Sequence, residues 1–211
     1  MAPIELKPVP VREDPVRRLP QLAAGLTLYG ASMALQIRAG LGLDPWDVLH
    51  QGVADRTGLS FGTVVSITGA LVLLAWVPLR QVPGVGTVSN VIVIGVAVDA
   101  TLAVLPHAGS APVAVAMLLA GVGLNGVAGG AYIGAGLGPG PRDGLMTGLV
   151  KKTGKSVGVI RTSIEVSVLV VGFFLGGTVG LGTVVYALSI GPLLQVFMPA
   201  FAIKQPVPAT A

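Results

Sequence analysis

The chain alternates between long apolar segments and short polar connections. Six apolar segments stand out, each close to the roughly 20 residues that one helical crossing of a bilayer needs. Strands of a transmembrane barrel are not expected, because they alternate apolar and polar residues in stretches of about ten. The pattern therefore predicts an all-α integral membrane protein with six transmembrane helices. These spans are expected at 19–37, 61–79, 85–105, 113–134, 157–175 and 182–203.

The composition supports the same environment. Hydrophobic residues make up 53% of the 211 residues and charged residues 10%, and the mean hydropathy is +0.84. A soluble domain carries roughly a quarter of charged residues, so this chain has too little polar material to cover a globule in water. The lipid bilayer is therefore the expected surrounding of the chain.

Two segments resemble each other at a distance of 96 residues. AGLGLDPWDVLHQGVADRTG occupies 39–58, and AGLGPGPRDGLMTGLVKKTG occupies 135–154. The same spacing aligns LAAGLTLYG at 22–30 with LLAGVGLNG at 118–126. We interpret this similarity as an internal duplication, with three spans in each copy. The two repeats are expected at 19–111 and 112–205.

An odd number of spans in each repeat makes the second repeat cross the membrane in the opposite direction. Cytoplasmic connections are enriched in Lys and Arg, and with the N-terminus inside only Arg38 and Arg56 face outward. The sequence therefore predicts two inverted three-helix repeats with both termini cytoplasmic. Residues 1–18 are expected to form a basic, Pro-rich cytoplasmic tail, and 206–211 a short C-terminal tail. The basic residues expected inside are Lys7, Arg12, Arg17, Arg18, Arg80, Arg142, Lys151, Lys152, Lys155, Arg161 and Lys204.

A Pro-Xaa-Asp sequence follows the first span of each repeat and predicts a short helix there. Pro45 and Pro141 cannot continue a preceding helix. Asp47 and Asp143 then fall where an N-cap or first-turn acid accepts backbone N–H groups. We expect these four residues to order two short helices. The helices lie either in the membrane interface or re-enter the protein as half-helices beside a substrate site.

Four polar residues within the predicted spans are candidates for a substrate-binding or coupling site. A charge at membrane depth is costly and normally faces a cavity or a partner. Asp99 in the third span corresponds to Gln195 in the sixth, and Arg161 and Glu165 stand one turn apart in the fifth. Structural roles stay open, since Asp99 lies near an interface and Arg161–Glu165 has the spacing of an intrahelical pair. Weaker candidates for cavity polar groups are Tyr29, Asn90, Asn125, Tyr132 and Tyr186.

Several kinds of chemistry lack the residues that they need. The chain has no Cys, so thiolate catalysis and Cys-ligated metals are excluded. His50 and His107 are isolated and expected near the outer surface, and zinc, nucleophile and phosphate-loop motifs do not occur. The net charge of +4 follows the predicted topology rather than nucleic-acid binding. We therefore expect no enzymatic activity, catalytic residue, cofactor, metal site or nucleic-acid partner.

The short-helix motifs also resemble a known family. GLGLDPWDVLHQG followed by TGLSFG, and GLGPGPRDGL followed by VKKTGKSVG, are similar to the YczE/YitT group of bacterial membrane proteins. The chain ends eight residues after its last predicted span, like the YczE branch, whereas YitT-branch members carry a soluble C-terminal domain. The resemblance implies a bacterial plasma-membrane protein. Members are often encoded near regulators that bind pyridoxal phosphate, which implies a vitamin-B6-related or amino compound as solute.

A small-solute transporter or permease is the function that these features predict. The duplicated halves and the polar residues at depth place its site between the repeats. A membrane-embedded accessory or assembly subunit of another enzyme or complex is the alternative, and a channel is a third. A homo-oligomer is compatible with each of them.

Overall fold

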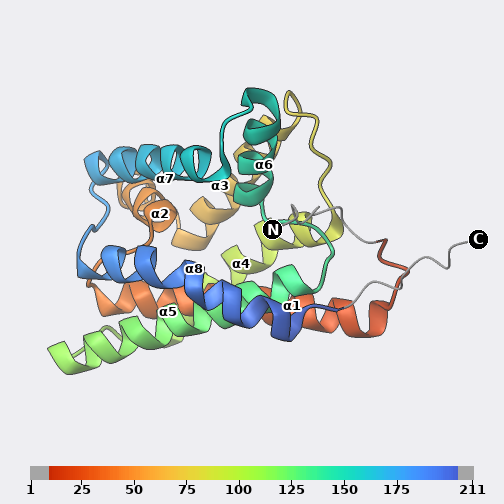
Figure 1. The fold of residues 1–211 in the computed structure, drawn as a ribbon. Coiled ribbons are helices and arrows are strands. Elements are labelled where there is room, and N and C mark those ends of the chain that lie inside the picture. Colours follow the sequence, from red (N-terminus) through yellow and green to blue (C-terminus); the bar gives the residue numbers. More distant parts are fainter. Residues whose placement is uncertain (1–9, 204–211) are drawn as a thin grey trace, which may run out of the picture.

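The computed structural model describes residues 10–203, which form eight α-helices and no strand (Figure 1). The all-helical prediction is therefore confirmed for this part of the chain. Residues 1–9 and 204–211, with Lys7, Lys204 and the predicted C-terminal tail, lie outside the described residues. In chain order the helices are α1 (Pro15–Ala39), α2 (Pro45–Thr57), α3 (Phe61–Trp76), α4 (Val85–Val104), α5 (Ala111–Gly134), α6 (Pro141–Thr153), α7 (Val157–Phe174) and α8 (Leu181–Phe201).

Prolines and glycines set the ends of the two short helices. Pro45 and Pro141 stand at the first turn of α2 and α6, where the missing N–H of proline costs no helical hydrogen bond. The helices end at Gly58 and Gly154, whose φ angles of 71° and 70° continue the chain in the left-handed conformation. A short helix therefore forms at each Pro-Xaa-Asp sequence, as the motif predicts.

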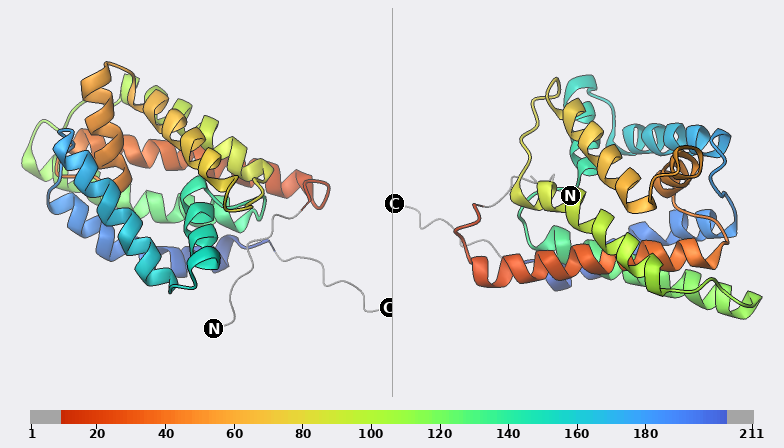
Figure 2. Two further views of the ribbon diagram at one scale, coloured as in Figure 1. Left: turned by 90° about the horizontal axis from the view of Figure 1, so that it is seen from above. Right: turned by 180° about the vertical axis from the view of Figure 1, so that it is seen from behind.

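Helices α1 and α5 form the centre of the fold and run side by side in opposite directions (Figures 1 and 2). Their close approach depends on glycine. A Cβ on Gly25 would lie 2.7 Å from the backbone nitrogen of Tyr132, and one on Gly121 would lie 2.8 Å from the Gln36 side chain. In addition, α4 packs against α1 and α8 packs against α5, so each central helix carries one further long helix.

The N-terminal turn of α1 is fixed to the end of α5. The helix begins at Pro15, so the last residues of the predicted tail are helical. Arg18 is only 1% exposed, and its Nη1 donates to the carbonyl oxygen of Ala135 at 2.7 Å. The carbonyls at a helix C-terminus lack intrahelical partners, so the Arg18 guanidinium supplies a hydrogen-bond donor to the end of α5.

The packing of the first half recurs 96 residues further along the chain. The Gly86 N–H donates to the carbonyl of Leu137, and the Gly182 N–H donates to the carbonyl of Leu41. Across the two halves, α3 packs against α6 and α7 packs against α2. The sequence similarity at this spacing is thus accompanied by equivalent contacts.

Within the described part of the chain, four helices are long and apolar enough to cross a membrane on their own, namely α4, α5, α7 and α8. The pair α2–α3, which is bent by 116°, would count as a fifth span if taken together. Helix α1 has 25 residues but carries several charged and amide side chains, and α3 has 16 residues. Length and composition therefore support four to five of the six predicted spans.

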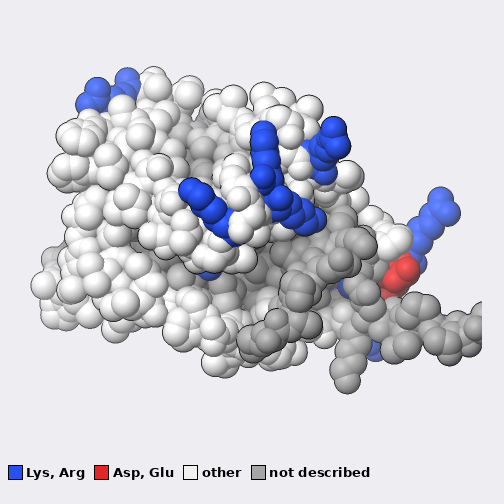
Figure 3. All heavy atoms as spheres, turned by 45° about the horizontal axis from the view of Figure 1, so that its top comes forward, with Lys and Arg blue, Asp and Glu red and all other residues white. Residues whose placement is uncertain are grey.

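The surface of the long helices is largely apolar. Leu188 on α8 is 73% exposed and Val96 on α4 is 65% exposed, and large hydrophobic side chains are exposed on α3, α5 and α7 as well. Figure 3 shows a face of mostly uncharged residues, with Lys and Arg gathered in a few places. Such extended apolar surface suits a lipid environment.

Candidate functional site

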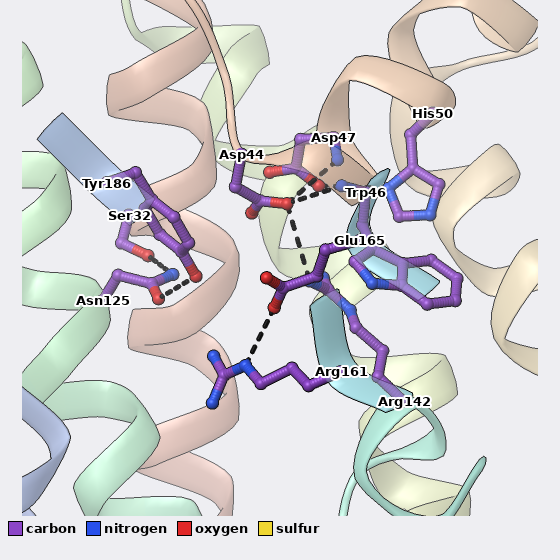
Figure 4. A network of polar contacts seen from close by, with 10 residues as sticks. All are labelled: Ser32, Asp44, Trp46, Asp47, His50, Asn125, Arg142, Arg161, Glu165 and Tyr186. Atoms are coloured by element: carbon purple, nitrogen blue, oxygen red, sulfur yellow. Dashed lines mark hydrogen bonds and ion pairs between the residues drawn. The ribbon is translucent and has the colours of Figure 1, made fainter. Parts of the chain in front are cut away.

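A cavity of about 130 Å³ lies where the two halves of the chain meet. Its walls come from α1, α2, α4, α5, α6, α7 and α8. A single water needs roughly 10–15 Å³ of such space, so the cavity has room for a small solute. The wall combines aromatic, amide and charged groups (Figure 4). Its polar residues are Tyr29, Asp44, Asn90, Asn125, Tyr132, Arg142, Asp143, Arg161, Glu165 and Tyr186.

The starts of α2 and α6 meet at this cavity through Trp46 and Arg142. Each residue directly follows the first proline of its helix, and the two positions are 96 residues apart, the spacing at which the two segments resemble each other. The guanidinium carbon of Arg142 lies 5.3 Å from the centroid of the Trp46 ring, a cation–π distance. Its Nη1 is also 3.5 Å from Oδ1 of Asp44. Trp46 and Arg142 therefore stand at equivalent positions, differ in residue type, and contact each other across the two halves.

Asp44 caps α2 and carries this ion pair. Its Oδ1 accepts the backbone N–H groups of Trp46 at 2.8 Å and Asp47 at 3.1 Å, and the side chain is 1% exposed. Its Oδ2 is buried without a hydrogen-bond partner. Burial first, and then the charge of Asp47, raise the pKa of Asp44 to about 6 against the opposing effect of Arg142. At neutral pH the carboxylate is therefore mostly ionised, and the ion pair holds.

Asp47 and Asp143 both lie in the first turn of their helices but bind different partners. Asp47 is 1% exposed, and its Oδ1 lies 3.0 Å from Nδ1 of His50. His50, which the sequence placed near the outer surface, is buried at 3% exposure. Asp143 accepts a hydrogen bond from the Tyr132 hydroxyl at 3.1 Å. Neither aspartate caps its helix, since Asp44 caps α2 and α6 has no side-chain cap.

Arg161 and Glu165 form an intrahelical ion pair on α7, with 2.9 Å between Nε and Oε1. Both residues line the cavity. Their side chains are 47% and 38% exposed, so the α7 wall is where the cavity reaches the surface. An exposed pair contributes only about 0–1 kcal/mol to stability, and its main consequence is the charge that it brings to the cavity.

Asp99 and Gln195 do not line this cavity. Oδ2 of Asp99 accepts the Ser60 hydroxyl at 2.5 Å, and its Oδ1 accepts the Gly62 N–H at 2.7 Å, so Asp99 joins α4 to the start of α3. It stands five residues after the cavity residue Ile94, which is roughly 140° further round the helix. Gln195 is exposed on α8. The structure therefore separates these two residues from Arg161 and Glu165.

The weaker tyrosine and asparagine candidates all line the cavity. The hydroxyl of Tyr186 lies 3.1 Å from Oδ1 of Asn125, whose Nδ2 donates to Oγ of Ser32 at 2.8 Å. The repeat spacing makes Tyr29 equivalent to Asn125, and Asn90 equivalent to Tyr186. Each equivalent pair thus supplies one phenol and one amide to the same wall.

One side of the site, formed by α3 and α4, is closed. The backbones of Gly62 and Gly95 are in such close contact that a Cβ on either residue would collide with the other. The Ser66 hydroxyl also donates to the carbonyl of Val91 at 2.8 Å. A second cavity of only about 40 Å³ remains beside these helices.

The two cavities share the Trp46–Arg142 contact. Both residues line the large cavity as well as the small one. The stacked pair therefore stands between the space beside α7 and α8 and the space beside α3 and α4.

The equivalent side, formed by α7 and α8, is open. Gly158 and Gly191 correspond to Gly62 and Gly95 in the repeat spacing, yet a Cβ on either would meet no atom within 4 Å. Helix α3 packs along α4, whereas α7 packs against α2 and α6 but not along α8. The two halves thus differ most at this pair of helices.

Comparison with known proteins identifies the family. The family of unknown function DUF6198 matches residues 16–199. The chain belongs to this family. The uncharacterized membrane protein YczE of Bacillus subtilis (strain 168) is 33% identical over 192 residues, covering 90% of this chain and 89% of its own length. An uncharacterized protein of Haemophilus influenzae is 39% identical over 181 residues, 86% of this chain and 83% of its own length.

The resemblance to YczE noted in the sequence is therefore confirmed, and the chain is a membrane protein of the YczE kind. The uncharacterized protein YyaS of Bacillus subtilis is a more distant relative, at 26% identity over 179 residues. No solved structure matches the chain. Every residue that lines the large cavity lies within the segment that matches the family DUF6198.

Proposed function

We propose that this membrane protein is a carrier for a small solute, with six spans arranged as two inverted three-helix repeats. Helix α1 has 25 residues and lies antiparallel to α5, which supports counting it as a span. Helix α3 and the turn at 77–80 together approach the length of about 20 residues that a crossing needs. The short helices α2 and α6 then re-enter from opposite sides.

The observation that carries this proposal is a difference between the two sides of the cavity. The helices α3 and α4 are in contact on one side, whereas the equivalent helices α7 and α8 are apart on the other. Gly62 and Gly95 hold α3 against α4, while the equivalent Gly158 and Gly191 stand apart. Inverted repeats give a carrier two such states, because the halves can exchange their packing around a fixed site. In the second state α7 closes on α8 and α3 leaves α4. A channel would instead need both sides open at once.

The site suits a polar solute. Two arginines and three carboxylates line a cavity that also offers phenol and amide groups, the mixture by which small-molecule sites fix orientation. With both termini in the cytoplasm of a bacterial cell, the open α7–α8 side faces inward and the closed α3–α4 side faces outward. The described state is then the inward-open one.

The first experiment is a solute screen on purified protein. A bound solute stabilises the native state by mass action, so metabolites that raise the melting temperature are carried forward to uptake into proteoliposomes. We expect Arg142→Gln and Glu165→Gln to reduce uptake of such a solute at least several-fold, and Gln195→Asn, on the exposed face of α8, to leave it unchanged. Stabilising solutes that enter no faster than into empty liposomes would reject the carrier and favour an accessory subunit.

The inverted architecture has its own test. Asp55 and Lys151 are equivalent in the repeat spacing, and both are exposed at the ends of α2 and α6. The chain has no native Cys, so Asp55→Cys and Lys151→Cys each give one thiol. A membrane-impermeant maleimide should label position 55 in intact cells and position 151 only after permeabilisation. Labelling of both from one side would exclude inverted repeats.

A further inference from the structure

Three titratable side chains follow one another at the start of α2. Asp44, Asp47 and His50 are spaced three residues apart, which keeps them on one side of the helix. Oδ1 of Asp44 accepts the Asp47 N–H, and Oδ1 of Asp47 lies 3.0 Å from Nδ1 of His50. None of the three is more than 3% exposed. We call Asp44, Asp47 and His50 the α2 triad.

The α2 triad connects the two cavities. Asp44 lines the large cavity beside α7 and α8, and His50 lines the small cavity beside α3 and α4. Asp47 lies between them, since its backbone N–H donates to Asp44 and its carboxylate contacts His50 (Figure 4). The second repeat does not reproduce this arrangement, since its equivalent residues are Gly140, Asp143 and Met146.

One atom of the α2 triad is poorly suited to carry a charge. Oδ2 of Asp44 is buried and has no hydrogen-bond partner. A buried carboxylate oxygen without a donor is costly while ionised, and adding a proton removes that cost. A proton on Oδ2 therefore relieves this penalty.

Among residues 10–203, one cation lies close to the α2 triad. Arg142 of α6 pairs with Asp44, while α3 contributes the ring of Phe61, 5.9 Å from that of His50. Helix α7 packs on α2 through the backbone of Gly172. The other titratable groups that face Asp44 across the cavity are Tyr29, Tyr132, Asp143, Arg161, Glu165 and Tyr186.

We infer that the α2 triad binds a proton whose movement is coupled to that of the solute, an inference that rests on the proposed carrier function. A proton from the open cavity adds to Oδ2 of Asp44 and leaves a neutral carboxyl. After the closure has switched to α7–α8 and the Arg142 contact has loosened, the proton leaves Oδ2 for the space that opens beside α3 and α4. One proton is taken up and one released in each cycle, and no other bond forms or breaks.

Protonation would also act on the contact between the halves. The ionised Asp44 attracts the guanidinium of Arg142, and Arg142 with Trp46 stands between the two cavities. A neutral carboxyl attracts the cation less, so proton binding loosens this contact. A ligand shifts a two-state equilibrium by binding one state better than the other, and here the proton favours the state in which Arg142 is released.

Distances between spin labels on α7 and α8 test this coupling. Val166 and Leu188 are 52% and 73% exposed, so labels on Val166→Cys and Leu188→Cys leave the interior undisturbed. We expect pulsed electron paramagnetic resonance to show a shift towards shorter distances when the pH falls from about 8 to about 5, a range that brackets the raised pKa of Asp44. Asp44→Asn, which mimics the neutral carboxyl, should give the short distances at every pH.

Two matched variants complete the test. Asp55→Asn, at an exposed position of the same helix and outside the cavity lining, should keep the pH dependence, and Asp44→Glu should show it if Asp44→Asn is unstable. The inference would be overturned if the distance between the two labels did not depend on pH in the parent protein. It would also be overturned if this distance still changed with pH in Asp44→Asn. If α7 still closes on α8 without any pH dependence, the carrier proposal stands and the proton coupling falls. If α7 never closes, both fall.

Discussion

The helix pairs α3–α4 and α7–α8 occupy equivalent positions at the spacing of 96 residues, but the first pair is closed and the second is open. The first pair carries Gly62 and Gly95 in backbone contact, and the second carries Gly158 and Gly191 with open space around them. Because the residue type is glycine at all four positions, the difference does not come from side-chain size at the contact. It arises from conformation, and it shows that one sequence pattern accommodates both a closed and an open arrangement.

The largest effect is expected from adding a single methyl group at the closed pair. In Gly62→Ala and Gly95→Ala the new Cβ collides with backbone of the facing helix, so we expect a loss of at least about 1–3 kcal/mol, the usual cost of overpacking. Gly158→Ala and Gly191→Ala meet no atom within 4 Å, and because alanine favours a helix over glycine by up to about 1 kcal/mol, both should unfold at or above the temperature of the parent. Thermal unfolding in detergent measures all four. Equal losses on both sides would show that α7 and α8 are packed together in the protein.

The second effect concerns the polar contact that holds the closed pair. Asp99→Ala removes the acceptor of Ser60 and of the Gly62 N–H, and each such hydrogen bond contributes about 0.5–1.5 kcal/mol. Its counterpart Gln195→Ala changes an exposed side chain and should stay within about 0.5 kcal/mol of the parent. The same unfolding measurement applies. Unchanged stability of Asp99→Ala would mean that this contact does not hold the closed side.

The smallest effect on stability is expected on the open side, where the charges serve the site. Replacing Arg161 and Glu165 together by Gln removes an exposed ion pair and should cost less than about 1 kcal/mol. Binding of any solute found in the thermal-shift screen should nevertheless weaken at least tenfold, which isothermal titration measures. Full binding by this double variant would place the solute elsewhere.

The sequence predicted the helices well because their ends are set by local chemistry. The apolar segments and the prolines at 45 and 141 mark seven of the eight helix starts to within two residues, while α1 begins four residues earlier than expected, at Pro15. Asp44 was missed as a cap although an aspartate directly before a proline at the first helical turn is a typical N-cap signal. Arg142 was assigned to the cytoplasmic surface because charge counting does not distinguish a loop cation from one that turns into a cavity.

Other features of the site could not be read from the chain. In a helix that is apolar on all sides the period of 3.6 residues carries little information, so Asp99 could not be assigned to the face towards α3. The sequence likewise does not predict that α3 and α4 are in contact while α7 and α8 are apart. The four glycines concerned stand in the same register in both halves, namely Gly62, Gly95, Gly158 and Gly191. The packing of α3 on α4 and the separation of α7 from α8 reveal this difference.

A pair of equivalent disulfides tests most directly whether the two closures exchange. A Cβ on Gly69 would lie 3.6 Å from Cβ of Val91, within the disulfide range of about 3.5–4.5 Å, so Gly69→Cys/Val91→Cys should oxidise readily and hold α3 on α4. The equivalent pair, Glu165→Cys/Ala187→Cys, joins helices that do not pack along each other here. If the closures exchange, this second disulfide also forms in membranes, and forms only when the first is absent. A second disulfide that never forms, or that forms regardless of the first, would contradict the alternating carrier.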